Sequence, residues 1–195
     1  MLRGWTMKKI LGVVGSPRRD GNTHILVASI LEGAKKQGAA TEILLLGDLA
    51  IAECDGCHAC WQGKDCCKND DMLGIYRKII ESDAIIFGTP VYWYGPTGLM
   101  KVFIDRFVYF NCPANRAKIR GKSAVIAVPF EEDNPDAAAL VVAFFEKSLA
   151  YLEMKLVGIV LVPGVADKGQ ILDKPESLKQ AHELGSRLAR GGRGR

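Results

Sequence analysis

Short apolar runs alternate with longer amphipathic segments along most of the 195-residue chain. Runs such as KILGVV, AIIFG and SAVIAV show no polar alternation, which is typical of strands buried on both faces of a sheet. The pattern predicts strands over residues 9–14, 42–46, 84–88, 123–128 and 155–162. It predicts helices over residues 22–37, 70–82, 98–110, 135–152 and 176–190.

This alternation predicts an α/β fold with a doubly wound, five-stranded parallel sheet. The order 2-1-3-4-5 suits five strands best among the common arrangements. We expect one domain over residues 1–195, with a cysteine-rich insertion at 53–70 after the second strand. Ligands of such sheets bind at the carboxyl ends of the strands, so the loops after strands one, three and four are the places to look for a site.

Composition narrows the class of protein. Apolar residues make up 48% and charged residues 25%, as in ordinary globular proteins. The formal charge of +4 lies mostly near the chain ends and forms no basic stripe, so no nucleic-acid partner is expected. No apolar run reaches the roughly 18 residues that span a membrane, and no signal peptide is recognisable, so we expect a cytoplasmic protein.

The loop after the first predicted strand has the residues that a phosphate group needs. Ser16, Asn22 and Thr23 offer short polar side chains, and Arg18 adds a positive charge. The helix that follows contributes free N–H groups and the positive end of its dipole. The loop matches neither a Walker A motif nor GxGxxG. The alternative is a polar turn that caps the helix and binds nothing.

The loop after the third strand carries three consecutive aromatic residues, which is unusual for a loop. Their faces and backbone could line a flat aromatic ring. The candidate residues are Thr89, Pro90, Val91, Tyr92 and Trp93. The alternative is that one or two of the aromatics pack against the next helix.

Five of the six cysteines lie between Cys54 and Cys67. The spacing Cys54-x2-Cys57-x2-Cys60-x5-Cys66 can wrap a loop around a cubane iron–sulfur cluster with four thiolate ligands. Zinc also accepts four thiolates, although its structural sites usually use two separated Cys-x2-Cys pairs. A third possibility is a set of free thiols. Cys112 stands apart and is predicted to be a buried thiol.

The two loops together resemble the NADPH-dependent FMN reductase branch of the flavodoxin-like fold. The resemblance spans about residues 8–165 and is carried by Gly15-Ser16-Pro17-Arg18, Gly21-Asn22-Thr23, Thr89-Pro90-Val91-Tyr92, and Lys101 with Asp105-Arg106. It implies that the first loop holds the FMN phosphate and that the second lies along the isoalloxazine ring. Lys101, Asp105 and Arg106 are expected to be mainly structural or interface residues.

The cysteine run resembles that of the iron–sulfur flavoproteins of anaerobic prokaryotes, which belong to the same fold. The resemblance implies a [4Fe-4S] cluster on Cys54, Cys57, Cys60 and Cys66. The Asp70-Asp71-Met72 register favours Cys66 over Cys67 as the fourth ligand. The resemblance also implies a homodimer or tetramer, with ferredoxin or a similar redox carrier as partner.

These resemblances predict a protein that passes electrons between FMN and the cluster. The sequence departs from the pattern of the FMN reductase family at the acidic loop Glu131-Glu132-Asp133, which would repel the phosphates of NADPH. An NAD(P)H-dependent flavin or quinone reductase without a functional cluster is the alternative. A third hypothesis is a flavodoxin-like binding module with a structural zinc ion.

Overall fold

The computed structural model describes residues 7–190, so both ends of the predicted 1–195 domain lie outside the described residues. Five parallel strands form one sheet in the order β2-β1-β3-β4-β5, which confirms the predicted topology. The strands are β1 (Lys9–Val14), β2 (Ala40–Leu45), β3 (Ala84–Gly88), β4 (Ser123–Pro129) and β5 (Lys155–Val162).

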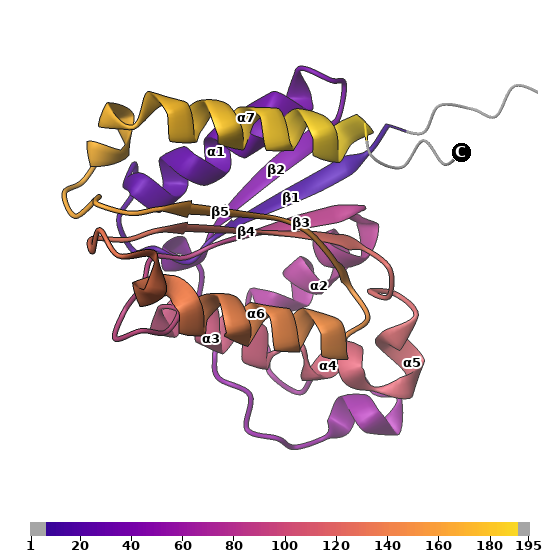
Figure 1. Ribbon diagram of the computed structural model, residues 1–195. Coiled ribbons are helices and arrows are strands. Elements are labelled where there is room, and N and C mark those ends of the chain that lie inside the picture. Colours follow the sequence, from indigo (N-terminus) through magenta and orange to yellow (C-terminus); the bar gives the residue numbers. More distant parts are fainter. Residues whose placement is uncertain (1–6, 191–195) are drawn as a thin grey trace, which may run out of the picture.

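Helices cover both faces of the sheet (Figure 1). One face carries α1 (Asn22–Lys35) and α7 (Pro175–Arg190). The other carries α2 (Met72–Glu81), α3 (Gly98–Asp105) and α6 (Ala139–Tyr151), with the short helices α4 (Val108–Asn111) and α5 (Pro113–Arg116) beyond them. Two short 3-10 helices, over Leu46–Asp48 and Ala59–Gln62, lie in the segment between β2 and α2, and two more, over Pro135–Ala138 and Gln170–Asp173, precede α6 and α7.

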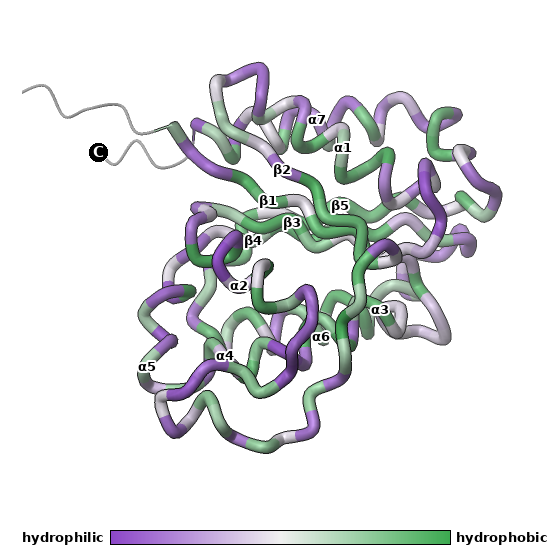
Figure 2. Tube along the Cα trace, turned by 180° about the vertical axis from the view of Figure 1, so that it is seen from behind, coloured by the Kyte–Doolittle hydropathy of each residue, from purple (hydrophilic) through white to green (hydrophobic). Residues whose placement is uncertain are grey.

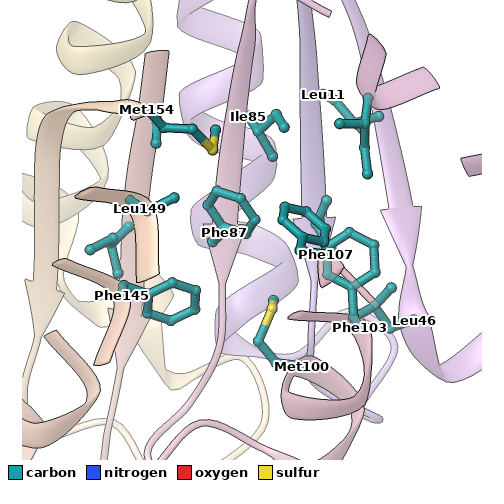
Figure 3. Close-up of a cluster of buried hydrophobic side chains, with 14 of the residues drawn as sticks. Leu11, Leu46, Ile85, Phe87, Met100, Phe103, Phe107, Phe145, Leu149 and Met154 are labelled. Carbon is teal, nitrogen blue, oxygen red and sulfur yellow. The ribbon is translucent and has the colours of Figure 1, made fainter. Parts of the chain in front are cut away.

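Hydrophobic residues concentrate in the strands and on the inner sides of the helices (Figure 2). An aromatic cluster fills the space between β3 and the layer of α3 and α6 (Figure 3). The Phe87 ring lies between those of Phe107 and Phe145, with centroid separations of 6.1 and 5.5 Å. Burying each such ring stabilises the fold by about 1.5–3 kcal/mol. Within residues 7–190, no helix combines the length and the apolarity needed to cross a lipid bilayer.

The predicted helix over residues 98–110 is divided in the structure. Helix α3 ends at Asp105, and the chain tightens through Arg106 before α4 begins at Val108. The Phe107 N–H donates to the Ile104 carbonyl, a separation of three residues, as in a 3-10 turn. The Arg106 carbonyl accepts from the Tyr109 N–H at 3.2 Å, again a separation of three residues, and it also accepts from the Tyr76 hydroxyl at 3.1 Å.

Helices α1 and α7 cross with their backbones nearly in contact. A Cβ atom at Gly33 would lie 1.9 Å from the His182 carbonyl oxygen, and one at Gly185 would lie 1.8 Å from the Ile30 carbonyl oxygen. The Ser186 hydroxyl donates to the Gly33 carbonyl across the same crossing, at 3.1 Å. Only glycine fits at both positions, because the backbones of the two helices approach so closely.

We predict that Gly185→Ala destabilises the protein, because a methyl group would push α7 away from the backbone of α1. Overpacking of this kind costs about 1–3 kcal/mol. The matched control is Gly74→Ala on α2, where an added Cβ meets no atom within 4 Å. The control should gain up to about 1 kcal/mol in free energy of unfolding from helix propensity. Urea unfolding of both variants checks this; equal stabilities would contradict the close crossing.

Candidate functional site

The loops after β1, β3 and β4 meet at the carboxyl edge of the sheet and surround a solvent-open hollow of about 510 Å³, which we call the strand-end hollow. A further segment at residues 165–166 closes one side. The hollow is lined by Ser16, Arg18, Asn22, Thr23, Pro90, Val91, Tyr92, Pro129, Phe130, Glu131, Val165 and Ala166. Seven of the nine residues predicted to bind a cofactor are thus brought together; Thr89 and Trp93 are not among the lining residues.

Thr89 lies behind the strand-end hollow and is fully buried. Its hydroxyl donates to the Pro90 carbonyl and accepts from the Thr97 N–H, at 3.0 and 3.1 Å. The Thr97 hydroxyl in turn donates to the Gly15 carbonyl at 2.5 Å. Thr89 and Thr97 therefore hold the loops after β1 and β3 together at the start of α3.

Asn22 fixes the segment at residues 165–171 against the start of α1. Its amide donates to the carbonyls of Val165 and Asp167, and its side-chain oxygen accepts from the Ile171 N–H at 3.1 Å. The residue at the N-cap of α1 is Gly21, with no side-chain cap. Asn22 therefore does not cap α1, and its side chain holds residues 165–171 instead. Residues 165–166 carry no sequence signal that would have placed them at the hollow.

Two arginines follow the first strand, and their side chains point to different places. Arg18 lines the strand-end hollow, where its guanidinium donates to the Ala166 carbonyl at 3.0 Å. Arg19 is turned to the exposed Asp48 carboxylate, 2.8 Å away. Glu131 adds an acidic group to the lining of the hollow. The hollow thus presents both a cation and an anion.

The aromatic run forms a two-residue hairpin turn. Tyr92 and Gly95 exchange backbone hydrogen bonds of 2.9 and 3.0 Å, while Trp93 and Tyr94 have positive φ values of 49° and 60°. Such turns usually carry Asn-Gly, because a left-handed conformation costs other residues about 1–2 kcal/mol each. Tyr92 stays at the hollow, whereas Trp93 is 98% exposed. The turn geometry is what directs Trp93 away from its predicted place.

The long loop between β2 and α2 lies beyond the helix layer (Figure 1) and forms a second site, the cysteine hollow. Its position confirms the predicted cysteine-rich insertion after the second strand. Helices α2 and α4 supply the opposite wall. The hollow is lined by Cys54, Asp55, Cys57, His58, Ala59, Cys60, Cys66, Cys67, Lys68, Tyr76, Arg106, Val108 and Tyr109.

All five cysteines of the run therefore face one space. The Sγ atoms of Cys57 and Cys67 are 3.1 Å apart, and the Asp55 carboxylate lies close enough to join them as a metal-ligating group. The hydrogen bond with Cys57 raises the pKa of Cys67 to about 11, and burial raises the pKa of Cys60. These thiols keep their protons in the metal-free protein, and binding a metal would release them.

Arg106 is the largest fully buried side chain within residues 7–190. Its Nη1 donates to the Ala52 carbonyl at 2.8 Å and to the Asp70 carboxylate at 2.5 Å. Its Nη2 donates to the other Asp70 oxygen and to the Cys66 sulfur, both at 3.2 Å. Burial alone would raise the pKa of Asp70, but the hydrogen bond and charge of Arg106, together with the backbone hydrogen bonds from Ala52 and Met72, outweigh it and hold this pKa below its usual value.

The structure thus adds a role that the sequence did not show. Arg106 was expected to be mainly structural or to lie at an interface, and Lys101 and Asp105 do form an exposed ion pair on α3. Arg106 instead reaches into the cysteine hollow. The Lys-x-x-x-Asp-Arg motif was the available signal, but it does not say which way the arginine points. Cys112 is fully buried, as predicted, and donates to the Tyr109 carbonyl at 3.0 Å.

Comparisons with known proteins agree on a family. The family model described as NADPH-dependent FMN reductase matches residues 8–158. The chain is similar to two proteins of Archaeoglobus fulgidus, each named iron–sulfur flavoprotein. One is 34% identical over 163 residues, covering 84% of this chain and 80% of that protein. The other is 32% identical over 182 residues, covering 93% of this chain and 79% of that protein.

Solved structures support the fold. An NAD(P)H:quinone oxidoreductase from Methanothermobacter marburgensis superposes with a TM-score of 0.78, covering 94% of this chain and 96% of that chain. The sequence identity is 17%, so this likeness concerns the flavodoxin-like architecture alone.

The strained turn leads to a prediction at Trp93. Trp93→Gly should be more stable than Trp93→Ala by roughly 1 kcal/mol, because glycine tolerates a positive φ while alanine does not. Both variants delete the same exposed side chain, so their difference isolates the backbone. Chemical unfolding of the two proteins provides the measurement. Equal stability, or a more stable alanine variant, would show that the turn does not hold a left-handed residue here.

Proposed function

The chain belongs to the iron–sulfur flavoproteins within the NADPH-dependent FMN reductase family, and on this premise we propose that it passes electrons between FMN and a [4Fe-4S] cluster. Family membership supports a flavin-linked redox role. The observation that carries the finer proposal is the convergence of five cysteines on one hollow beside a buried cation. When bound, FMN exchanges electrons singly or in pairs and such a cluster exchanges one at a time, so together they can connect two kinds of redox partner.

The strand-end hollow suits FMN. We assign the phosphate to the loop after β1, where Ser16, Arg18 and Thr23 lie beside the N-terminus of α1. Arg18 would contribute a charge-assisted hydrogen bond, and Asn22 would shape the site by holding residues 165–171 in place. Pro90, Val91 and Tyr92 would lie along the flavin ring. Thr89 supports this loop from behind, and Trp93 is not assigned to the flavin.

The cysteine hollow suits an all-thiolate centre. Cys54, Cys57 and Cys60 come from the first part of the loop, and Cys66 completes the set that we propose. The contact between Arg106 and Cys66 supports this choice, because a nearby guanidinium compensates a thiolate charge. The short distance between Cys57 and Cys67 favours Cys67 as the competing fourth ligand. Gly56 and Gly63, with φ of 70° and 76°, provide the turns of the loop.

A second candidate function is an NAD(P)H-dependent flavin or quinone reductase without a working cluster. The description of the matching family model favours it. Glu131 at the strand-end hollow opposes it, because a carboxylate there repels the phosphates of the nucleotide. A structural zinc ion on the same cysteines is the corresponding alternative for the loop. Ferredoxin or a similar carrier as partner, a homodimer or tetramer, and a cytoplasmic location belong to the proposal as expectations.

We predict that anaerobically purified protein contains one FMN and four iron and four sulfide ions per chain. Cys66→Ala should lose most of its iron and sulfide while keeping FMN, whereas Cys67→Ala should keep both. Absorption spectra with iron, sulfide and flavin assays measure this. Stoichiometric flavin with zinc, or without iron and sulfide, would support the second candidate function. Loss of iron in Cys67→Ala alone would reverse the assignment of the fourth ligand.

We predict that Arg18→Gln weakens FMN binding about tenfold, because a charged hydrogen bond contributes about 1.5–3 kcal/mol. Arg19→Gln is the matched control: it removes the same charge from the neighbouring residue, which faces Asp48. Quenching of flavin fluorescence during titration of the apoprotein measures both affinities. An equal loss of FMN affinity in the two variants would mean that Arg18 affects binding only through the overall charge of the protein and not through a direct contact.

A further inference from the structure

The guanidinium of Arg106 is oriented by four hydrogen bonds from its two terminal nitrogens. Each of its terminal nitrogens meets two acceptors: the Ala52 carbonyl and one Asp70 oxygen for Nη1, and the other Asp70 oxygen and the Cys66 sulfur for Nη2. The Arg106 and Asp70 side chains are 1% and 8% exposed. The group has no freedom to turn away, so the N–H that points at Cys66 stays there.

The ion pair is neutral as a whole, but it is not symmetric with respect to the sulfur. Arg106 touches Cys66, while Asp70 binds the guanidinium and the backbone N–H groups of Ala52 and Met72. The pair therefore acts as a dipole whose positive end faces the cysteine. Because both charges are shielded from water, solvent screens this dipole much less than it would an exposed pair.

A dipole in this orientation has a definite effect on a thiolate-ligated centre. Adding one electron makes the centre more negative by one charge, with no bond made or broken. Hydrogen bonds to the ligating sulfurs and nearby positive charge stabilise the more negative state and so raise the reduction potential. The effect depends on the proposed presence of a cluster on Cys66.

We propose that Arg106 is a positioning residue that raises the reduction potential of the cluster by donating to Cys66, and that Asp70 limits the size of this effect. The inference rests on the proposed function. It deepens that function because the potential of the cluster relative to the flavin decides in which direction electrons flow between them.

The two partners should shift the potential in opposite directions. Arg106→Gln removes the cation and should lower the equilibrium constant for one-electron reduction about tenfold, or about 59 mV for a one-electron couple. Asp70→Asn keeps an acceptor for the backbone but leaves the guanidinium uncompensated, so the potential should rise. Lys101→Gln is the control, because it removes an exposed positive charge from α3 that pairs with Asp105. Its potential should match that of the unmodified protein.

A redox titration of the anaerobic holoprotein, followed by the electron paramagnetic resonance of the reduced cluster, measures these potentials. Opposite shifts in Arg106→Gln and Asp70→Asn support the proposal. A merely structural role would move both variants in the same direction, and an Arg106→Gln potential equal to that of the Lys101→Gln control would overturn it. Absence of a cluster in the unmodified protein would instead overturn the proposed function.

Arg106→Gln could lose its cluster, so a second measurement uses the unmodified chain. Protein labelled with nitrogen-15 arginine should show a hyperfine coupling between the reduced cluster and a guanidinium nitrogen in electron–nuclear double resonance. The coupling should vanish in Arg106→Lys, which keeps the charge without the planar fork. A spectrum of the unmodified protein without that coupling would overturn the proposal whatever the variants do.

Discussion

The buried ion pair of Arg106 and Asp70 is the contact on which the arrangement of the cysteine loop depends. It joins the end of α3 to the start of α2, and it also holds the entrance of the loop. Ala52 is bound through both of its backbone groups: its carbonyl accepts from Arg106 and its N–H donates to Asp70. Removing one partner of such a pair leaves an uncompensated buried charge, at a cost of about 3–5 kcal/mol. The loop therefore has a defined geometry although most of it is exposed.

The same helix that presents Arg106 also organises the strand-end hollow. At the start of α3, Thr97 binds the Gly15 carbonyl and the Thr89 hydroxyl, which joins the loops after β1 and β3. At its end, Arg106 reaches the cysteine hollow. An eight-residue helix is roughly 12 Å long, so one short rigid element positions both sites. Its inner residues Met100 and Phe103 are fully buried against the sheet, which fixes its direction (Figure 3).

The sequence predicts those features that depend on residues close together in the chain, and it does not predict those that depend on contacts between distant residues. The five strands were predictable because buried parallel strands are continuous apolar runs, and the cysteine spacing marked the insertion directly. The division of the helix at Arg106 was not predictable, because the tight turn there also includes a hydrogen bond from the Tyr76 hydroxyl, thirty residues away in the chain. The position of Val165 and Ala166 beside the loop after β1 was not predictable either, because it also depends on contacts between residues far apart in the chain. The outward position of Trp93 was hidden because composition alone does not reveal a left-handed turn.

Two features that the fold does not need for its own stability lie at or beside the two hollows. Burying a guanidinium requires desolvation, which the contacts with Asp70 and Ala52 must offset, and a hydrophobic side chain of similar volume would avoid that cost. The left-handed turn at Trp93 and Tyr94 is unfavourable for bulky residues, and Trp93 gains almost no burial in exchange. Strain of this kind persists where a site requires it. That Arg106 directs an N–H of Nη2 at a cysteine sulfur therefore points to a role in the site beyond holding the loop.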